Sequence, residues 1–136
     1  MDMDISIHPS SVLGIMFLLH FLADFNLQIG ARLDKFKQWR WWRKQIPAEK
    51  EEKWRKYNDD YKVALWIHSF QWALVTCLPL AMCRGTVYGV SVFVHASAHY
   101  IVDDLKANWM RINLIQDQVF HTVQVLVIWA TWMVSR

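Results

Sequence analysis

Four apolar runs that contain no Asp, Glu, Lys or Arg constrain the fold of this 136-residue chain more than any other feature. They are 18 to 21 residues long, and a helix of about 20 apolar residues is enough to cross a bilayer. A soluble bundle would need apolar runs of only about 10–14 residues. The runs are Ile5–Ala23, Val63–Cys83, Gly85–Val102 and Gln118–Ser135.

The composition favours helices throughout and a single domain over residues 1–136. Glycine and proline together number only seven, so the chain has little turn material and few helix breakers. The length also fits one domain. The sequence therefore predicts an all-α, four-helix transmembrane bundle, with helices at about residues 10–29, 61–82, 86–106 and 114–134.

A charged, Trp-rich connector, residues 31–60, separates the first two predicted helices. Residues 32–62 hold 11 of the 15 Lys and Arg. Aromatic rings beside basic side chains are typical of the lipid headgroup layer, so the connector is expected to be an amphipathic, interfacial helical segment. It could instead dock a protein partner, and no nucleic acid is expected because the basic excess is confined to this segment. The interleaved tryptophans are Trp39, Trp41, Trp42 and Trp54.

The distribution of basic residues predicts an orientation in the membrane. Basic connections face the cytoplasm, and the two most basic connections are residues 32–62 and 106–111. Both termini would then lie outside the inner (cell) membrane. The N-terminus lacks the basic region of a secretory signal, so the first run is expected to be retained as a helix of a multi-pass protein.

Three acid–imidazole pairs share the spacing i, i+4: His20/Asp24, His99/Asp103 and Asp117/His121. That spacing places each pair on one helix face. Five of the groups lie about 9–15 Å inside the basic helix borders, at a rise of 1.5 Å per residue, and all in the cytoplasmic half: Asp24, His68, His99, Asp117 and His121. Ionisable groups inside membrane segments are costly and default to a functional interpretation.

Imidazole and carboxylate together suit a divalent metal, with zinc preferred and manganese or iron as alternatives, and with one or two ions. The competing interpretation is interhelical hydrogen bonding. Such bonds average only about 0.6 kcal/mol, whereas each carboxylate near mid-bilayer costs about 2.5–3.5 kcal/mol. The predicted metal ligands are His20, Asp24, His99, Asp103, Asp117 and His121.

Other polar residues of the runs and their borders receive supporting roles. His68 or His95 would shuttle a proton as the catalytic residue. For His95, core packing is an equal alternative. Gln28 and Gln118 would orient ligands, and Lys106 would face an anionic substrate.

Three motifs of the chain resemble one family. They occur in order along the chain, with a lone histidine on the second helix. The motifs are His20-Phe-Leu-Ala-Asp24-Phe-Asn-Leu-Gln28, His99-Tyr-Ile-Val-Asp103-Asp-Leu-Lys106 and Asp117-Gln118-Val-Phe-His121. This pattern is similar to the uncharacterised membrane family called domain of unknown function 3307, seen in bacteria and their phages. The resemblance implies a small multi-pass membrane protein with no established activity. The chain departs from the family in its longer connector and in Asp104, at a commonly aromatic position.

Two functions are consistent with this pattern. One is an intramembrane metal-dependent hydrolase that acts on a lipid-linked or headgroup-level substrate. A more distant similarity to membrane-bound proteins classed as metal-dependent hydrolases favours it by analogy only. The other is a non-enzymatic membrane scaffold or ion- and proton-handling module that recruits a partner through residues 32–62. The oligomeric state is left open.

Overall fold

The computed structural model describes residues 8–27, 33–45 and 59–136, and this part of the chain is helical with no strand. The all-α prediction is therefore confirmed. The elements are α1 (Pro9–Phe21), the π-helix η1 (Leu22–Leu27), α3 (Leu33–Phe36), α4 (Trp39–Gln45), α6 (Asp60–Thr76), α7 (Leu78–Ala81), α8 (Gly85–Ala107) and α9 (Leu114–Ser135).

The long helices α8 and α9 begin and end within one residue of the predicted bounds. The predicted second helix is instead divided, because α6 ends at Thr76 and the short α7 follows, with Pro79 in its first turn. Proline lacks an N–H and its ring clashes with the preceding turn, so an α-helix does not continue through it. The N-cap of α1 is His8, whose Nδ1 accepts from the Ser10 amide, rather than Ser10 itself.

The first predicted helix changes geometry partway along. At Leu22 the α-helix passes into the π-helix η1, which the apolar pattern does not predict. A π-turn closes i→i+5 hydrogen bonds, is rare, and occurs frequently at functional sites. Here it carries Asp24, one of the predicted ligands.

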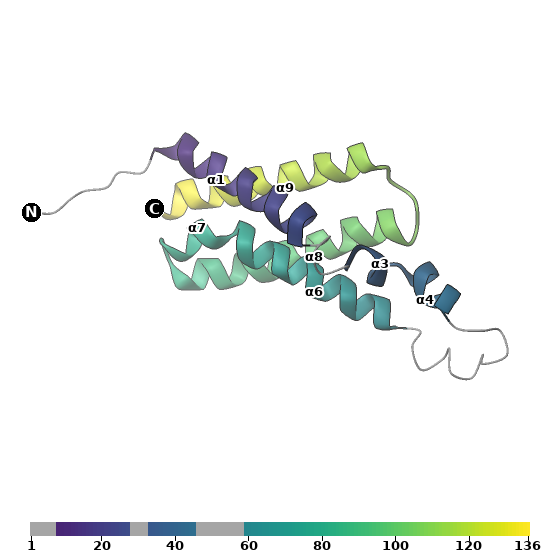
Figure 1. Cartoon of the computed structure of the whole chain (residues 1–136). Coiled ribbons are helices and arrows are strands. Elements are labelled where there is room, and N and C mark those ends of the chain that lie inside the picture. The colour runs from purple at the N-terminus through teal and green to yellow at the C-terminus, as the bar shows by residue number, and fades with distance from the viewer. Residues whose placement is uncertain (1–7, 28–32, 46–58) are drawn as a thin grey trace, which may run out of the picture.

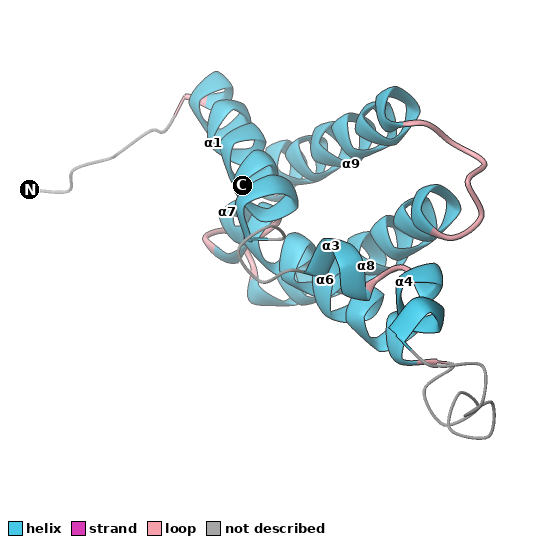
Figure 2. Ribbon diagram, turned by 45° about the vertical axis from the view of Figure 1, so that its right-hand side comes forward, coloured by secondary structure: helices cyan, strands magenta, loops and turns pink. Residues whose placement is uncertain are grey.

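Figures 1 and 2 show the long helical segments as an antiparallel bundle, with the start of α1 and the end of α9 at one end. The short helices α3 and α4 and the link between α8 and α9 lie at the opposite end. Helix α8 packs mainly on α6, whereas α1 packs on α9 and α6. Trp129 Nε1 donates to the carbonyl of Pro9 at 3.0 Å and so joins α9 to the start of α1.

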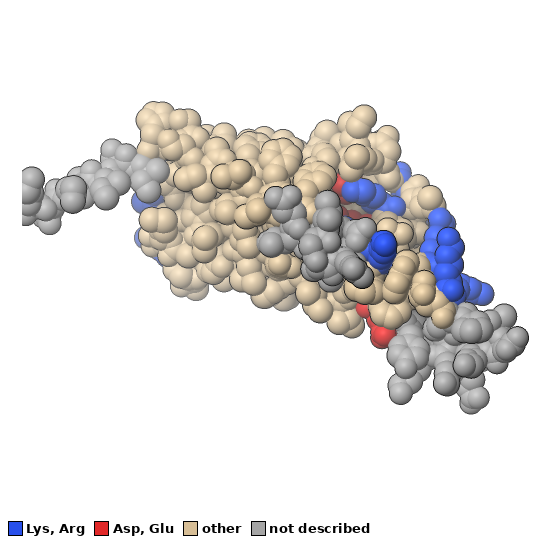
Figure 3. Space-filling model, in the orientation of Figure 1, with Lys and Arg blue, Asp and Glu red and all other residues tan. Residues whose placement is uncertain are grey.

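The bundle exposes many large apolar side chains and buries ionisable groups in part of its interior, the reverse of a typical soluble protein. Leu18 and Phe93 are 67% and 65% exposed, whereas His99 and Asp117 are fully buried. Figure 3 shows uncharged atoms over the middle of the molecule and most of the visible Lys and Arg at the end that carries α3 and α4. An apolar exterior of this extent is what a lipid environment favours.

Within the described part of the chain, α9 is the one helix long and apolar enough to cross a membrane. Helix α1 with the first part of η1 is apolar but shorter. One helix thus has the length and composition of a membrane span, and the four-span transmembrane arrangement stays a prediction.

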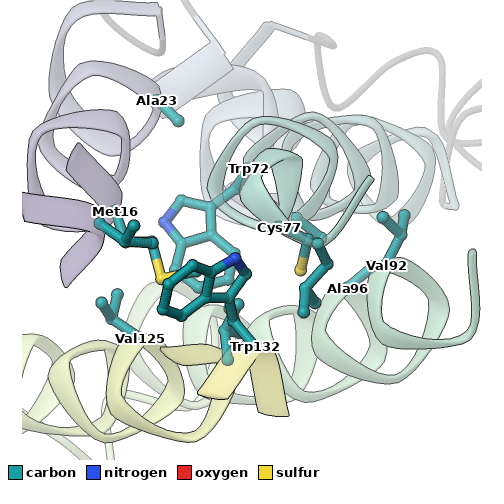
Figure 4. Close-up of a cluster of buried hydrophobic side chains, with 12 residues drawn as sticks. Met16, Ala23, Trp72, Cys77, Val92, Ala96, Val125 and Trp132 are labelled. Atoms are coloured by element: carbon teal, nitrogen blue, oxygen red, sulfur yellow. The ribbon is translucent and has the colours of Figure 1, made fainter. Parts of the chain in front are cut away.

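The interior near the termini, here called the apolar half, is a conventional core. Figure 4 shows Met16 of α1 beside the indole rings of Trp72 and Trp132, with Val125 below them. Ile128 completes this layer and is fully buried. The polar groups lie farther along the same helices, toward the charged end.

Candidate metal centre

The structure brings together ionisable side chains from four separate segments in the other half of the bundle interior, here called the polar half. Each side chain is at most 6% exposed. The π-helix supplies the first, α6 the second, and α8 and α9 supply two each. They are Asp24, His68, His99, Asp103, Asp117 and His121.

Asp103 is the hub of this cluster. Its Oδ1 lies 3.3 Å from His121 Nε2 and 3.8 Å from His99 Nε2. Its Oδ2 lies 3.3 Å from His68 Nε2 and 2.6 Å from Lys37 Nζ. One carboxylate therefore contacts side chains from α6, α8, α9 and the connector.

Two triads have donor atoms that all lie within 4.8 Å of one another: Asp24/His68/His99 and His99/Asp103/His121. Donors around a tetrahedral zinc are roughly 3.3 Å apart, because each is about 2.0–2.1 Å from the ion. The observed separations agree: His68 Nε2 lies 3.2 Å from His99 Nε2 and 3.6 Å from Asp24 Oδ1. The cluster thus has the chemistry and spacing of a metal site, for one ion or for two neighbours.

The hydrogen bonds of Gln124 fix the orientation of the His121 ring. Gln124 Nε2 donates to the backbone carbonyl of His95 at 3.3 Å, so its Oε1 must face His121 Nδ1, at 3.1 Å. Because an amide oxygen only accepts, Nδ1 carries a proton. In neutral His121 the lone pair on Nε2 then points at two carboxylates, Asp103 and Asp117, each 3.3 Å away.

Two buried polar atoms of the cluster lack a hydrogen bond within the described part of the chain, although one of them, Asp117 Oδ1, lies 3.3 Å from His121 Nε2. Asp117 Oδ1 and His99 Nδ1 have no hydrogen-bond partner among the described residues. Buried polar atoms are rarely left unsatisfied, and each such atom needs a physical explanation. A cation among the imidazole and carboxylate lone pairs would supply one for Asp117, so the residues present fit a divalent ion.

Stacked rings position the imidazoles. Trp72 stacks on His99 with ring centroids 4.4 Å apart, and His99 stacks on His121 at 4.1 Å. Trp72 Nε1 also donates to His20 Nδ1 at 2.9 Å. Indole N–H is only a donor, so neutral His20 carries its proton on Nε2 and presents a donor there. His20 stays a predicted ligand, but binding an ion through Nδ1 would break this hydrogen bond.

Two lysines neutralise part of the negative charge. Lys106 was predicted to face an anionic substrate. In the structure its Nζ lies 2.5 Å from Asp117 Oδ2, so it contacts the protein's own carboxylate. Lys37 contacts Asp103 from the connector and is 7% exposed. Sequence reasoning missed Lys37, because nothing distinguishes it from the other basic residues around it.

Gln118 contacts two of the predicted ligands, and its role in orienting them stays a prediction. Its Nε2 lies 3.0 Å from Asp24 Oδ2 and 3.2 Å from Asp117 Oδ2, and so it joins η1 to α9. Gln124 was not predicted, although it stands three residues after His121 on the same helix face, a spacing that indicates contact.

The two predicted proton shuttles occupy different environments. His68 contributes its Nε2 to the first triad, where it can ligate as well as carry a proton. His95 belongs to neither triad, and its buried Nδ1 has no partner among the described residues. Both shuttle roles stay predictions.

The remaining predicted residues fall outside the cluster. Trp39, Trp41 and Trp42 lie on α4 at the charged end and are half-buried. Trp41 packs edge-on against Phe36, with ring centroids 4.9 Å apart. Gln28 and Trp54 lie outside the described residues.

Comparison with known proteins adds no assignment: no family, no curated protein and no solved structure matches the chain. The resemblance noted from the three motifs therefore stays a prediction, and the function must be argued from the site.

Proposed function

We propose that the chain is a multi-pass membrane protein whose polar half binds a divalent metal, zinc first and manganese or iron as alternatives. The bound metal serves hydrolysis of a lipid-linked or headgroup-level substrate. The observation that carries this proposal is the environment of His121. Its Nε2 faces two carboxylate oxygens at 3.3 Å, while Gln124 Oε1 accepts from the other ring nitrogen, so a neutral His121 directs its Nε2 lone pair into the cluster.

The exterior of the bundle supports the membrane part of the proposal. Large apolar side chains are exposed on α1, α6, α8 and α9, and the basic residues around α4 gather at the end opposite the termini. Basic segments favour the cytoplasmic side. We therefore place the connector 32–62 in the cytoplasm and both termini outside, with the interior site near the inner surface.

Membrane integration and orientation have direct tests. A multi-pass protein stays in the membrane through alkaline extraction and leaves it only with detergent. Cys83 follows α7 at the terminal end and is partly exposed, whereas Cys77 is buried. A membrane-impermeant maleimide should label Cys83 in intact cells from outside. Labelling only after cell lysis would reverse the orientation, and release by alkali would refute integration.

The cluster residues have distinct roles in this proposal. His68, His99, His121, Asp24 and Asp103 would hold the ion. A bound divalent ion supplies Lewis acidity and makes water a competent nucleophile near neutral pH. Asp117, whose Oδ1 lacks a hydrogen bond among the described residues, would add a further ligand, and His20, which carries its proton on Nε2 when neutral, would support the set.

The surrounding residues position those groups and move the proton. Gln124 keeps the His121 lone pair directed into the cluster, and Gln118 holds Asp24 and Asp117 at a fixed separation. His95 lies one helical turn from His99, with its Nδ1 open for a proton. It is the candidate to carry the proton away from the reacting water.

The enzymatic part is tested with purified protein reconstituted in lipid nanodiscs. The protein is loaded with zinc, manganese or iron, and headgroup release from defined phospholipids is followed by mass spectrometry. Metal-dependent release that is absent from the Asp103→Asn protein supports hydrolysis. Release that persists at full rate in chelated, metal-free protein would refute a metal-dependent mechanism.

A second function is favoured by the charges of the cluster. Three buried carboxylates, Asp24, Asp103 and Asp117, face two ammonium groups, Lys37 and Lys106. A second proton on His121 would balance the charges without a metal. The polar half would then be a structural ion network, and the chain a non-enzymatic scaffold or proton-handling module that recruits a partner through residues 32–62. Wild-type protein that carries no metal and melts at the same temperature with and without chelator would favour this function.

A further inference from the structure

We infer that Lys37 and Lys106 form a binding site for a phosphate group at the charged end of the metal centre. This inference rests on the proposed function, because it requires a cation in the cluster. It names the chemistry that the loaded site recognises: a phosphate, borne either by a lipid headgroup or by a soluble molecule.

The two lysines approach the cluster in the same way from different parts of the chain. Lys37 Nζ contacts Asp103 Oδ2 at 2.6 Å, and Lys106 Nζ contacts Asp117 Oδ2 at 2.5 Å. The other oxygen of each carboxylate, Oδ1, faces His121 Nε2 at 3.3 Å. Each ammonium group therefore contacts one of the two carboxylates that face His121.

The charge balance of the loaded site favours an added anion. Three carboxylates face two ammonium groups in the cluster. One divalent ion leaves an excess of one positive charge, and two ions leave an excess of three. Uncompensated charge in a buried site is strongly destabilising. A phosphate, with one or two negative charges, balances the excess of a one-ion site and reduces that of a two-ion site.

Lysine suits this role as a mobile, compact positive charge that binds phosphate. The carboxylates that the lysines now contact are the groups a metal would attract. When Asp103 and Asp117 turn toward the ion, the two ammonium groups gain capacity to bind an incoming phosphate.

The position of Lys37 is fixed by a dedicated set of hydrogen bonds. Asn108, just after α8, donates to the carbonyl of Lys37 at 3.1 Å and accepts from the amide of Trp39 at 2.9 Å. Asp104 in turn accepts from Asn108 Nδ2 at 2.7 Å. This clamp holds the backbone directly after Lys37 and so helps to place the lysine at the cluster.

The site has an accessible side at the expected depth. The side chain of Lys106 is 32% exposed, whereas that of Asp117 is fully buried, so an anion can approach past Lys106. The same end carries α4, with Arg40, Arg43 and Lys44 exposed beside half-buried tryptophans. Basic and aromatic residues of this kind lie at headgroup level, where lipid phosphates are found.

Phosphate binding by the delipidated, zinc-loaded protein in detergent tests the inference. Inorganic phosphate is titrated by calorimetry, and the zinc content of each sample is measured alongside. Lys37→Gln and Lys106→Gln should each weaken phosphate binding about tenfold or more, because each removes a charged donor. Both should keep their zinc. Lys62→Gln is the matched control, since Lys62 is exposed and pairs with Asp59 at 2.7 Å; its phosphate affinity should not change.

Further variants distinguish an effect of charge from an effect on folding. A competition experiment with lipids distinguishes a phosphate on a lipid headgroup from one on a soluble molecule. Lys37→Arg should retain most of the binding, whereas Asn108→Ala should weaken it with zinc retained. Displacement of phosphate by phosphatidic acid, but not by phosphatidylcholine, identifies a headgroup; phosphate binding that phosphatidic acid does not displace identifies a soluble ligand.

Two results would overturn this inference and leave the metal site intact. One is zinc-loaded wild-type protein that binds no phosphate. The other is phosphate binding by the Lys37→Gln and Lys106→Gln proteins that equals that of the wild type. Wild-type protein without metal would overturn both the inference and the metal site, because the excess positive charge would not exist.

Discussion

The apolar half and the polar half of the bundle are built from the same helices but are filled by opposite kinds of side chain. Near the termini, Trp72, Val125 and Ile128 fill the interior, as in an ordinary core. Two turns away along α9, fully buried Asp117 and His121 occupy the corresponding positions. The helices can therefore pack with apolar contacts alone, and the costly ionisable groups are best explained by a ligand.

The largest effect is expected from Asp103→Asn, which acts on the hub of the polar half. Metal affinity should fall more than the about 10- to 100-fold typical of losing an outer-shell partner, because Asp103 contacts three imidazoles. Elemental analysis and metal titration measure this loss. Asp104→Asn changes the neighbouring carboxylate, which bonds Asn108 and Trp109 instead, and should keep its metal.

The converse substitution acts on the apolar half. Ile128→Ala removes a fully buried side chain and should reduce the free energy of unfolding by about 2–5 kcal/mol. It should leave the metal content at the wild-type level. Unfolding in mixed micelles measures the first effect and elemental analysis the second. Metal loss equal to that of Asp103→Asn would show that the two halves are not separable.

A smaller effect is expected from Gln124→Leu, which frees the His121 ring without removing a ligand. Metal affinity should fall about 10- to 100-fold, as for other outer-shell partners. Gln124→Glu keeps an oxygen acceptor for His121 Nδ1 and should retain most of the affinity. Equal losses in the Leu and Glu variants would show that the orientation of the ring is not what matters.

The smallest and most gradual effect is that of acid on the loaded protein. Protons compete with the metal for imidazole nitrogens, so metal occupancy should fall as the pH decreases from about 7.5 to 5.5. The transition should be reversible and without loss of helicity, because the apolar half holds the helices together. Circular dichroism with parallel metal analysis checks this, and unfolding that precedes metal release would contradict it.

Much of this architecture could be predicted from the sequence. Uncharged runs gave the bounds of α8 and α9, because long helices with few breakers leave little choice of where to end. The i, i+4 spacing of His99/Asp103 and Asp117/His121 placed each pair on one face, and the structure has both pairs in the cluster.

Three features could not be predicted, for different physical reasons. The π-turn around Asp24 depends on tertiary packing, since local propensity favours the α-helix. Lys37 reaches Asp103 across 66 positions of sequence, and no periodicity in a charged connector indicates which lysine will do so. The helix breaks after Thr76, three residues before Pro79. The proline therefore indicates that the second helix is interrupted but not the residue at which it ends.

The most direct test of the metal centre is X-ray absorption at the zinc edge of the loaded, detergent-purified protein. Nitrogen and oxygen donors from His68, His99, His121 and the carboxylates should appear at about 2.0–2.1 Å, with imidazole scattering and no sulfur. Asp103→Asn protein prepared in the same way should show no bound zinc. A zinc–sulfur distance of about 2.3 Å, or wild-type protein that binds no metal, would contradict the account.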